Sequence, residues 1–198
     1  MAATLAHEIK NPIAGIRSGI QLLKGRTVKD GDKMLCDSMI HEIDRVTALI
    51  MNLLTLSIRR ESPKTEISVT GVLKEIGMIY AKGPDSRRAI AFCGGRRGTE
   101  ACLNENEFRQ IIHNLISNSL RALVPDREGQ IKLMAAAQEK EVIVTVQDNG
   151  KGMTEEEVSK ALEPFYTKSI NGTGLGLSIV SRLVESNGGT MEIVSKPG

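Results

Sequence analysis

The sequence predicts an α plus α/β protein in which a helical hairpin precedes a two-layer α/β sandwich. From Met1 to about Arg60, apolar residues recur at steps of three and four, which is the helical period. Beyond Glu66, short β-like runs alternate with helical runs, an order that indicates helices layered on one face of a mixed sheet. The polar, proline-containing segment 59–64 separates the two patterns. We therefore predict one domain over residues 1–62 and a second over 63–198.

The first domain is predicted to be a dimerisation unit. The glycine-containing segment 25–31 divides it into two helices. Their periodic positions are Ile9, Ile13, Ile16, Ile20 and Leu23 in the first helix, and Met39, Ile43, Val46, Ile50, Leu53 and Ser57 in the second. Two helices cannot cover both stripes well, so we expect two hairpins to form a four-helix bundle in a homodimer. A monomeric hairpin packed on the neighbouring domain is the alternative.

The second domain is predicted to alternate strands and helices. Its expected strands are residues 67–69, 89–93, 130–137, 141–147 and 190–194, and its expected helices are one that ends at Tyr80 and those over 104–123, 154–162 and 175–187. Two of these helices begin with a local signature. Asn104 and Thr154 are each followed three residues later by a glutamate, which is the capping-box spacing.

Composition limits the classes of partner. The 26 lysines and arginines nearly balance 24 aspartates and glutamates, so the net charge of +2 predicts neither nucleic-acid binding nor contact with an anionic membrane. The three cysteines fit neither metal-ligand spacing nor a disulfide framework, which favours reduced thiols in the cytosol. No stretch approaches the roughly 18–20 apolar residues of a membrane span. We expect a cytoplasmic location for this part, with any membrane tether lying upstream.

A candidate nucleophile lies near the start of the first helix, in the segment Ala-His-Glu-Ile-Lys-Asn-Pro. His7 lies off the centre of the apolar stripe, so we expect it to meet solvent. A neutral imidazole is a competent nucleophile near pH 7, and the neighbouring Glu8 is placed to take or hold a ring proton. Asn11, one turn later, can orient a phosphoryl group or a water. Taken alone, the pattern also fits an ordinary surface histidine.

A second cluster lies on the predicted helix 104–123. Asn114, Asn118 and Arg121 share one face at four-then-three spacing. Amides and a cation aligned in this way suit a hydrated Mg²⁺ and its phosphates. A solvated helix face is an equally good interpretation of this pattern by itself.

A third cluster follows the predicted strand 141–147. A carboxylate held at a strand end, here Asp148, can accept the exocyclic amine of adenine. Gly150 and Gly152 let the backbone approach the ring closely. The alternative is a tight turn, for which Asp-Asn-Gly is favourable.

The fourth cluster comes directly before the predicted helix 175–187. Gly172, Gly174 and Gly176 alternate with Thr173 and Leu175, and this arrangement presents amides and a positive helix end to phosphate. A Rossmann site is disfavoured because no strand leads into the glycines. Segment 164–174 is predicted to be a short lid over bound nucleotide.

In this order, the clusters resemble the H, N, G1, F and G2 boxes of two-component sensor histidine kinases, whose catalytic domain belongs to the GHKL ATPase group. The resemblance covers nearly the whole chain and is greatest to the nitrogen-regulator kinases with short lids. It implies that ATP phosphorylates His7, with Glu8 as general base, and that the phosphoryl group passes to an aspartate of a response-regulator receiver domain. Asn11 would serve a phosphatase activity toward that regulator.

The resemblance also assigns the nucleotide-binding residues. Asn118 would coordinate Mg²⁺, and Asn114 and Arg121 would lie near the phosphates of ATP or ADP. Asp148 would read adenine. The remaining positions that it implies are Gly150, Gly152, Tyr166, Lys168, Gly172, Thr173, Gly174, Leu175 and Gly176. Members of the family lead us to expect a sensor module upstream of His7 and another strand after Gly198.

Two other functions compete with this interpretation. A GHKL ATPase or serine kinase without phosphohistidine would lack the hairpin, and hydrolytic members need a glutamate where Asn114 lies. A non-catalytic dimeric scaffold would not need Asn118, Asp148 or the glycines of the lid. Phosphatase activity that dominates in the cell is compatible with the kinase assignment.

Overall fold

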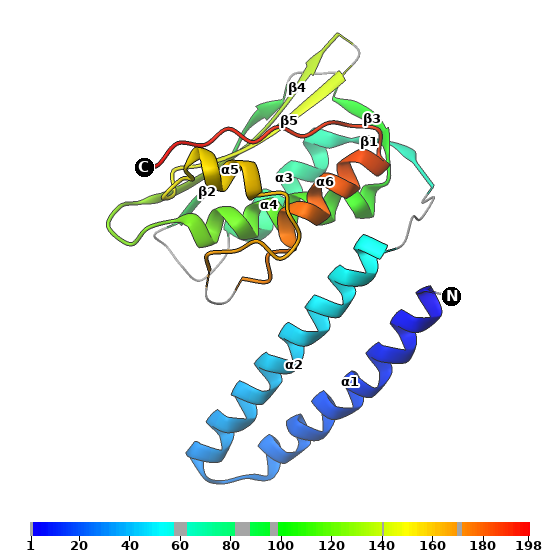
Figure 1. Ribbon diagram of the computed structural model, residues 1–198, viewed down its shortest axis with the longest axis vertical. Coiled ribbons are helices and arrows are strands. Elements are labelled where there is room, and N and C mark those ends of the chain that lie inside the picture. Colours follow the sequence, from blue (N-terminus) through cyan, green and yellow to red (C-terminus); the bar gives the residue numbers. More distant parts are fainter. Residues whose placement is uncertain (1, 58–62, 82–87, 96–98, 140, 170–171) are drawn as a thin grey trace. The chain divides into compact units, whose positions relative to one another are not determined.

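A computed structural model describes residues 2–57, 63–81, 88–95, 99–139, 141–169 and 172–198 (Figure 1). Within the helices, some side chains also lie outside the described part, among them those of His7 and Glu8. The chain divides into two compact units, Met1–Arg59 and Arg60–Gly198. Residues 59–62 of the predicted linker lie outside the described residues.

The first unit is a helical hairpin. Helix α1 spans Ala2–Arg26 and helix α2 spans Asp30–Ser57 (Figure 1). The amide of Thr27 still donates to the carbonyl of Leu23 at 3.0 Å, and the chain then turns over residues 27–29. Asp30 and Asp32 place negative charge in the first turn of α2, which the positive end of the helix dipole stabilises. The predicted break at 25–31 is therefore confirmed.

Two ion pairs cross the hairpin in one antiparallel register. Arg17 Nε lies 2.8 Å from Asp44 Oδ1, and Lys24 Nζ contacts Asp37 Oδ1. From Arg17 to Lys24 the chain advances along α1 by as many residues as it goes back along α2 from Asp44 to Asp37, so both pairs fit one antiparallel register. Both pairs are substantially exposed, and pairs of that kind add little to stability. Their contribution is to favour this register of the two helices.

The hairpin covers only part of its predicted apolar stripes. Ile20 is buried, and Ile9, Ile13, Ile43 and Ile50 are half-buried. Large apolar side chains that remain exposed in this unit include Ile16, Leu23, Met39, Val46 and Leu53. Much of the predicted bundle surface is thus presented outward by a single chain.

The second unit contains two small sheets among its described residues. Strand β1 (Thr65–Ser68) pairs antiparallel with β3 (Glu100–Leu103). The other sheet has the order β2-β4-β5, formed by Arg88–Gly95, Gly129–Gln138 and Glu141–Asp148. Strand β2 is parallel to β4, whereas β4 and β5 are antiparallel, so this sheet is mixed as predicted.

Four helices complete the unit: α3 (Val69–Ala81), α4 (Glu105–Ala122), α5 (Glu155–Lys160) and α6 (Gly176–Ser186) (Figure 1). Along β4, Ile131 and Leu133 are buried while Gln130 and Lys132 are exposed, so one face of the sheet carries the core. The fully buried side chains of the helices include Leu73, Ile76, Ile112, Ile116, Ile179 and Val180. Each contributes roughly 1.5–3 kcal/mol through removal from water. The predicted two-layer α/β sandwich is confirmed.

One expected strand is absent, and one observed strand was not predicted. Residues 190–194 form no strand, and beyond them the chain end bonds to the 151–153 loop. The Gly198 amide donates to the Lys151 carbonyl at 3.0 Å, and Ser195 Oγ accepts from the Met153 amide at 3.0 Å. Strand β3 escaped prediction because Glu-Ala-Cys-Leu has little β propensity, and pairing with β1 is a tertiary effect.

The two predicted capping boxes also differ. At α5 the box is complete: Thr154 Oγ1 accepts from the Glu157 amide at 3.3 Å, and Glu157 Oε2 accepts from the Thr154 amide at 2.6 Å. At α4 only Asn104 plays its part, accepting from the Glu107 amide at 2.9 Å. The Glu107 carboxylate instead accepts from Asn187 Nδ2 at 2.8 Å. That partner joins the start of α4 to the end of α6.

Among the described residues, no helix combines the length and apolar character that crossing a bilayer requires.

Candidate functional site

The candidate nucleophile lies in the N-terminal part of α1. His7 and Glu8 are successive residues of this helix, and their side chains fall outside the described part. Asn11 follows one turn later, and its side chain is exposed. The helix continues through Pro12. The predicted spacing of His7 and Asn11 on one helix is therefore present.

Helix α4 presents the predicted polar face. Asn114, Asn118 and Arg121 all lie on it, and Arg121 Nη1 donates to Asn118 Oδ1 over a long 3.4 Å. Asn114 Nδ2 is buried and, within the described part of the chain, has no hydrogen-bond partner. An unsatisfied buried amide costs about 1–3 kcal/mol. This donor is consequently suited to an acceptor that the described residues do not supply.

The first residue of α6 lies against Asn118. A Cβ atom built on Gly176 would be 3.3 Å from Asn118 Nδ2 and 3.4 Å from its Oδ1. A larger residue at the start of α6 would therefore press on this amide. The second and fourth sequence clusters, separated by more than fifty residues, meet here. Directly before α6, the Thr173 hydroxyl accepts from the Leu175 amide at 3.3 Å.

The loop after β5 is pinned by two side chains. Asp148 is exposed at the end of β5, and its Oδ1 accepts from the Gly150 amide at 2.9 Å. Asn149 accepts from the Gln130 amide at 2.8 Å and donates to the Glu128 carbonyl at 2.8 Å. Asn149 was not predicted as a site residue, although asparagine in a turn often bonds nearby backbone. The loop thereby holds the Asp148 carboxylate, which retains further acceptor positions.

The two glycines of this loop are required by backbone contacts. A Cβ on buried Gly150 would lie 2.6 Å from the carbonyl oxygen of Ala122, at the end of α4. Gly152 has a φ of +66°, and a Cβ there would lie 1.8 Å from the Lys196 carbonyl oxygen. A side chain at Gly150 would collide with the end of α4, and one at Gly152 would collide with the chain end. The sequence predicted a close approach of a ring or a tight turn at these glycines, and the contacts with α4 and the chain end are findings of the structure.

We expect Gly150→Ala (G150A) to lower the free energy of unfolding of the second unit by about 1–3 kcal/mol, since the added methyl meets the backbone of α4. Gly77→Ala (G77A) is the matched control. Its Cβ would meet Leu133 at an ordinary 3.6 Å, and alanine favours α3 by about 1 kcal/mol over glycine. Urea unfolding followed by circular dichroism measures both. Equal stabilities of the two variants would contradict this packing.

The predicted lid is closed at its base. The Phe165 amide donates to the Gly174 carbonyl at 2.9 Å. Gly174 has a φ of +68°, and a Cβ on it would lie 2.3 Å from the Phe165 carbonyl carbon. Phe165 itself has a φ of +69°, unusual for a bulky residue. Further along, the Gly172 amide donates to Ser169 at 3.0 Å, and residues 170–171 lie outside the described part.

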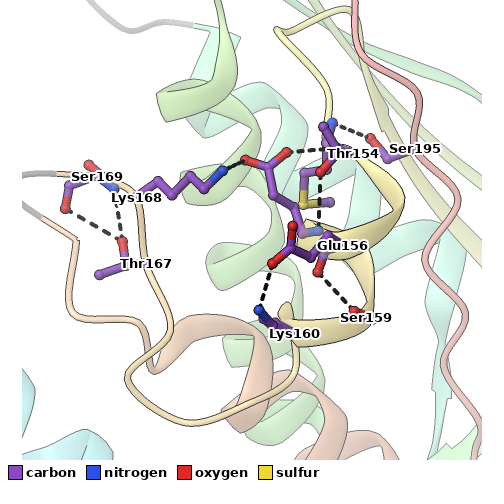
Figure 2. A network of polar contacts seen from close by, with 10 residues as sticks. Thr154, Glu156, Ser159, Lys160, Thr167, Lys168, Ser169 and Ser195 are labelled. Carbon is purple, nitrogen blue, oxygen red and sulfur yellow. Dashed lines mark hydrogen bonds and ion pairs between the residues drawn. The ribbon is translucent and has the colours of Figure 1, made fainter.

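Lys168 is bound to helix α5. Its Nζ lies 2.7 Å from Glu157 Oε1. Figure 2 shows Lys168 extending from the lid toward the start of α5, where Thr154 lies. The half-buried Tyr166 donates its amide to the Glu163 carbonyl at 3.2 Å. The lysine lowers the pKa of Glu157 to about 2, with a further contribution from the Thr154 amide. Glu157 was predicted only as a helix cap. Capping uses one of its carboxylate oxygens, so the other oxygen was free to bind a second partner, and this is the signal that could have pointed to Lys168.

We expect Lys168→Met (K168M) to raise the pKa of Glu157 from about 2 toward its ordinary value, because the largest cause of the depression is removed. The depressed pKa means that the pair stabilises the fold above the unfolded pKa near 4.5 and that this contribution is lost as pH falls through about 2. Carboxyl-carbon NMR titration measures the midpoint. Lys160→Met is the control, because Lys160 pairs with Glu156. A Glu157 midpoint unchanged in K168M would contradict the assignment.

Two family models match the chain. Residues 1–62 match the His Kinase A (phospho-acceptor) domain, and residues 103–198 match the histidine kinase-, DNA gyrase B- and HSP90-like ATPase domain. Together they account for most of the sequence and follow each other in chain order.

Curated relatives match along the whole length of this chain. The sensory histidine kinase/phosphatase NtrB of Azospirillum brasilense is 31% identical over 100% of this chain and 52% of its own length. The sensor histidine kinase ZraS of Klebsiella oxytoca is 30% identical over 100% of this chain and 43% of its own. The chain spans about half the length of the curated relatives that it matches.

Solved structures share the fold. Full-length ShkA in complex with AMPPNP has a TM-score of 0.78 at 23% identity, covering 93% of this chain and 40% of ShkA. ThkA in complex with the response regulator protein TrrA has a TM-score of 0.66 at 24% identity, over 96% of this chain and 55% of ThkA. With both domain models, these sequence relatives and the fold in agreement, the chain belongs to the two-component sensor histidine kinases with a GHKL-type catalytic domain.

Proposed function

We propose that this chain catalyses ATP-dependent phosphorylation of its own His7 and passes the phosphoryl group to an aspartate of a response-regulator receiver domain. The observation that carries the proposal is the close approach of Asn118 to the first residue of α6. One turn earlier on α4, Asn114 Nδ2 is buried and has no hydrogen-bond partner among the described residues. A polar helix face that meets a helix N-terminus suits a charged phosphate group. The same chain contains the phosphoacceptor-type helix.

The residues at this contact fit a magnesium nucleotide. The amide oxygen of Asn118 is the hard ligand that Mg²⁺ prefers, so we assign the metal to Asn118. Asn114 Nδ2 and the Arg121 guanidinium would donate to phosphate oxygens. When bound, Mg²⁺ supplies charge neutralisation across those oxygens. In our assignment, the approach to α6 cradles the phosphates through Gly172, Thr173, Gly174, Leu175 and Gly176.

The loop after β5 and the lid form the other parts of the proposed site. The Asp148 carboxylate, held at the end of β5 by the Gly150 amide, would accept the exocyclic amine of adenine. Gly150 and Gly152 would border that pocket. From the lid, Tyr166 would contact the nucleotide and Lys168 would meet a phosphate once it leaves Glu157.

In the transfer step, a ring nitrogen of His7 forms a bond to the γ-phosphorus while the bond to the leaving oxygen of ADP breaks. Glu8 holds the proton on the other ring nitrogen, which keeps the attacking lone pair available. We place the domain boundary between residues 62 and 63, with the second unit carrying the γ-phosphate to His7. In-line positioning then supplies much of the rate enhancement.

The proposed partners follow from the first unit. Its exposed Ile16, Leu23 and Met39 support a homodimer in which two hairpins complete a four-helix bundle. A receiver domain would dock on the hairpin, as expected for a kinase of this family. We place the reaction in the cytoplasm, where ATP is available, and expect neither nucleic acid nor membrane contact by this part of the protein.

A phosphatase activity toward the phosphorylated regulator is a second proposed function. Relatives named histidine kinase/phosphatase are about 30% identical to this chain, and the Asn11 side chain is exposed one turn after His7. Its amide would orient a water for hydrolysis of the acyl phosphate.

Incubation of the chain with γ-labelled ATP and Mg²⁺ tests the main proposal. We expect an acid-labile, base-stable label that moves to a cognate receiver domain when a panel of receivers is added. A chain that binds nucleotide but acquires only acid-stable label, or none, would overturn the proposal.

A further inference from the structure

We propose that Glu157 is a positioning residue for the lid, holding Lys168 against α5 until the phosphates of a nucleotide compete for the lysine. We call the Lys168–Glu157 ion pair the lid latch. This inference rests on the proposed nucleotide site and assigns a regulatory role to one acid beside it. Nucleotide binding and release of the lid are coupled, because the phosphates and Glu157 compete for the ammonium group of Lys168.

The lid latch has one fixed partner and one exposed partner. The Glu157 carboxylate is bound through both oxygens, with Oε1 at 2.7 Å from Lys168 Nζ and Oε2 accepting from the Thr154 amide at 2.6 Å. Its side chain is 20% exposed, whereas that of Lys168 is 64% exposed. The helix cap therefore holds the carboxylate in place. When the pair separates, the lysine and the lid segment that carries it must be the parts that move.

The surrounding charges single out Glu157. The first turn of α5 also contains Glu155 and Glu156, but Glu156 is paired with Lys160 of the same helix at 2.7 Å. Of the other two acids, Glu157 is the one that caps the helix. Lys168, which belongs to the lid, binds Glu157. Glu157 is thus the α5 residue through which the position of the lid is controlled.

Phosphate is a suitable competitor for this lysine. A nucleotide triphosphate carries several negative charges, whereas Glu157 carries one, and lysine is a common point-charge ligand for phosphate. An exposed ion pair contributes little and is readily exchanged. The lid latch therefore defines the nucleotide-free position of Lys168 without preventing its release. Removing the latch should make nucleotide binding tighter, because Lys168 then no longer has to break an ion pair before it binds a phosphate.

The variant Glu157→Gln (E157Q) separates the two roles of this residue. Glutamine at the third position of a capping box still accepts from the cap amide, so α5 keeps its start, but the ion pair is lost. Glu156→Gln (E156Q) is the matched control, since it removes the same charge and an ion pair of the same length, 2.7 Å, without touching the lid. The two variants differ mainly in their effect on Lys168.

Calorimetric titration of the full chain with magnesium and AMPPNP, a non-hydrolysable ATP analogue, tests the inference. We expect E157Q to bind about two- to fivefold more tightly than wild type, and E156Q to stay within about 1.5-fold of it. In the K168M background, E157Q should have no further effect. Without nucleotide, amide hydrogen exchange in residues 165–169 and 172–175 should be faster in E157Q than in E156Q.

The outcomes separate this inference from the proposed function. Wild-type chain that does not bind AMPPNP would overturn both. Binding by wild type, with E157Q no tighter than E156Q or with its gain retained in K168M, would overturn the lid latch alone. Equal exchange of the lid in E157Q and E156Q would also overturn it.

Discussion

We expect His7→Gln (H7Q) to eliminate autophosphorylation, lowering the rate by more than about 10⁴-fold, as removal of a nucleophile commonly does. Glutamine is polar and compatible with a helix, so α1 should form, but its amide nitrogen has no available lone pair. Nucleotide binding should be unchanged, because the residues assigned to it lie in the unit Arg60–Gly198. Labelled ATP measures the first quantity and calorimetry the second.

The matched control for H7Q is His41→Gln, because His41 is an exposed histidine of α2 in the same unit. It should retain full labelling. Acid-labile label that persists in H7Q and disappears in His41→Gln would transfer the assignment to the other helix. Loss of labelling in both variants would point to damage to the hairpin, which thermal unfolding of each variant would reveal.

The second large effect is expected for Asn118→Ala (N118A), which should weaken magnesium-nucleotide binding by about 100-fold and abolish labelling. The substitution removes the proposed metal ligand and the polar group that faces the start of α6, while alanine favours the helix. Arg121 loses only a long 3.4 Å bond, so the fold should be little affected. Calorimetry with AMPPNP, with and without Mg²⁺, measures the change.

Asn106→Ala provides the control for N118A, since Asn106 is an exposed asparagine of the same helix. Its nucleotide affinity should equal that of wild type. Wild-type chain in EDTA should bind as weakly as N118A, because both conditions remove the same interaction. Tight, magnesium-dependent binding by N118A would refute the assignment of the metal to Asn118.

Long periodic segments of the sequence predicted their structure well. Helices α1, α2, α4 and α6 follow apolar repeats that must face a core, and their expected bounds differ from the observed ones by only a few residues. Asn118 and Gly176 were predicted to serve the same ligand, and their contact is a finding of the structure. The residue types at this site therefore predicted which two helices meet, and their phosphate-binding role stays a prediction.

The features that sequence reasoning missed depend on tertiary partners. Asn104 has the spacing of a capping box, yet Asn187, directly after α6, binds the glutamate that would complete it. Residues 190–194 alternate like a strand, but a strand requires a neighbour with which to pair. Lys168 was expected at a phosphate, and its bond to Glu157 arises because α5 and the lid meet in space. Local propensity contains none of this information.

Identification of the phosphorylated side chain tests the central claim most directly. The wild-type chain would be incubated with ATP and Mg²⁺, digested at alkaline pH to preserve phosphohistidine, and mapped by mass spectrometry. We predict that the phosphoryl group lies on His7 and that it is absent when N118A is treated in the same way. Phosphate on a serine, threonine or other histidine, or none at all in a sample that binds nucleotide, would contradict the account.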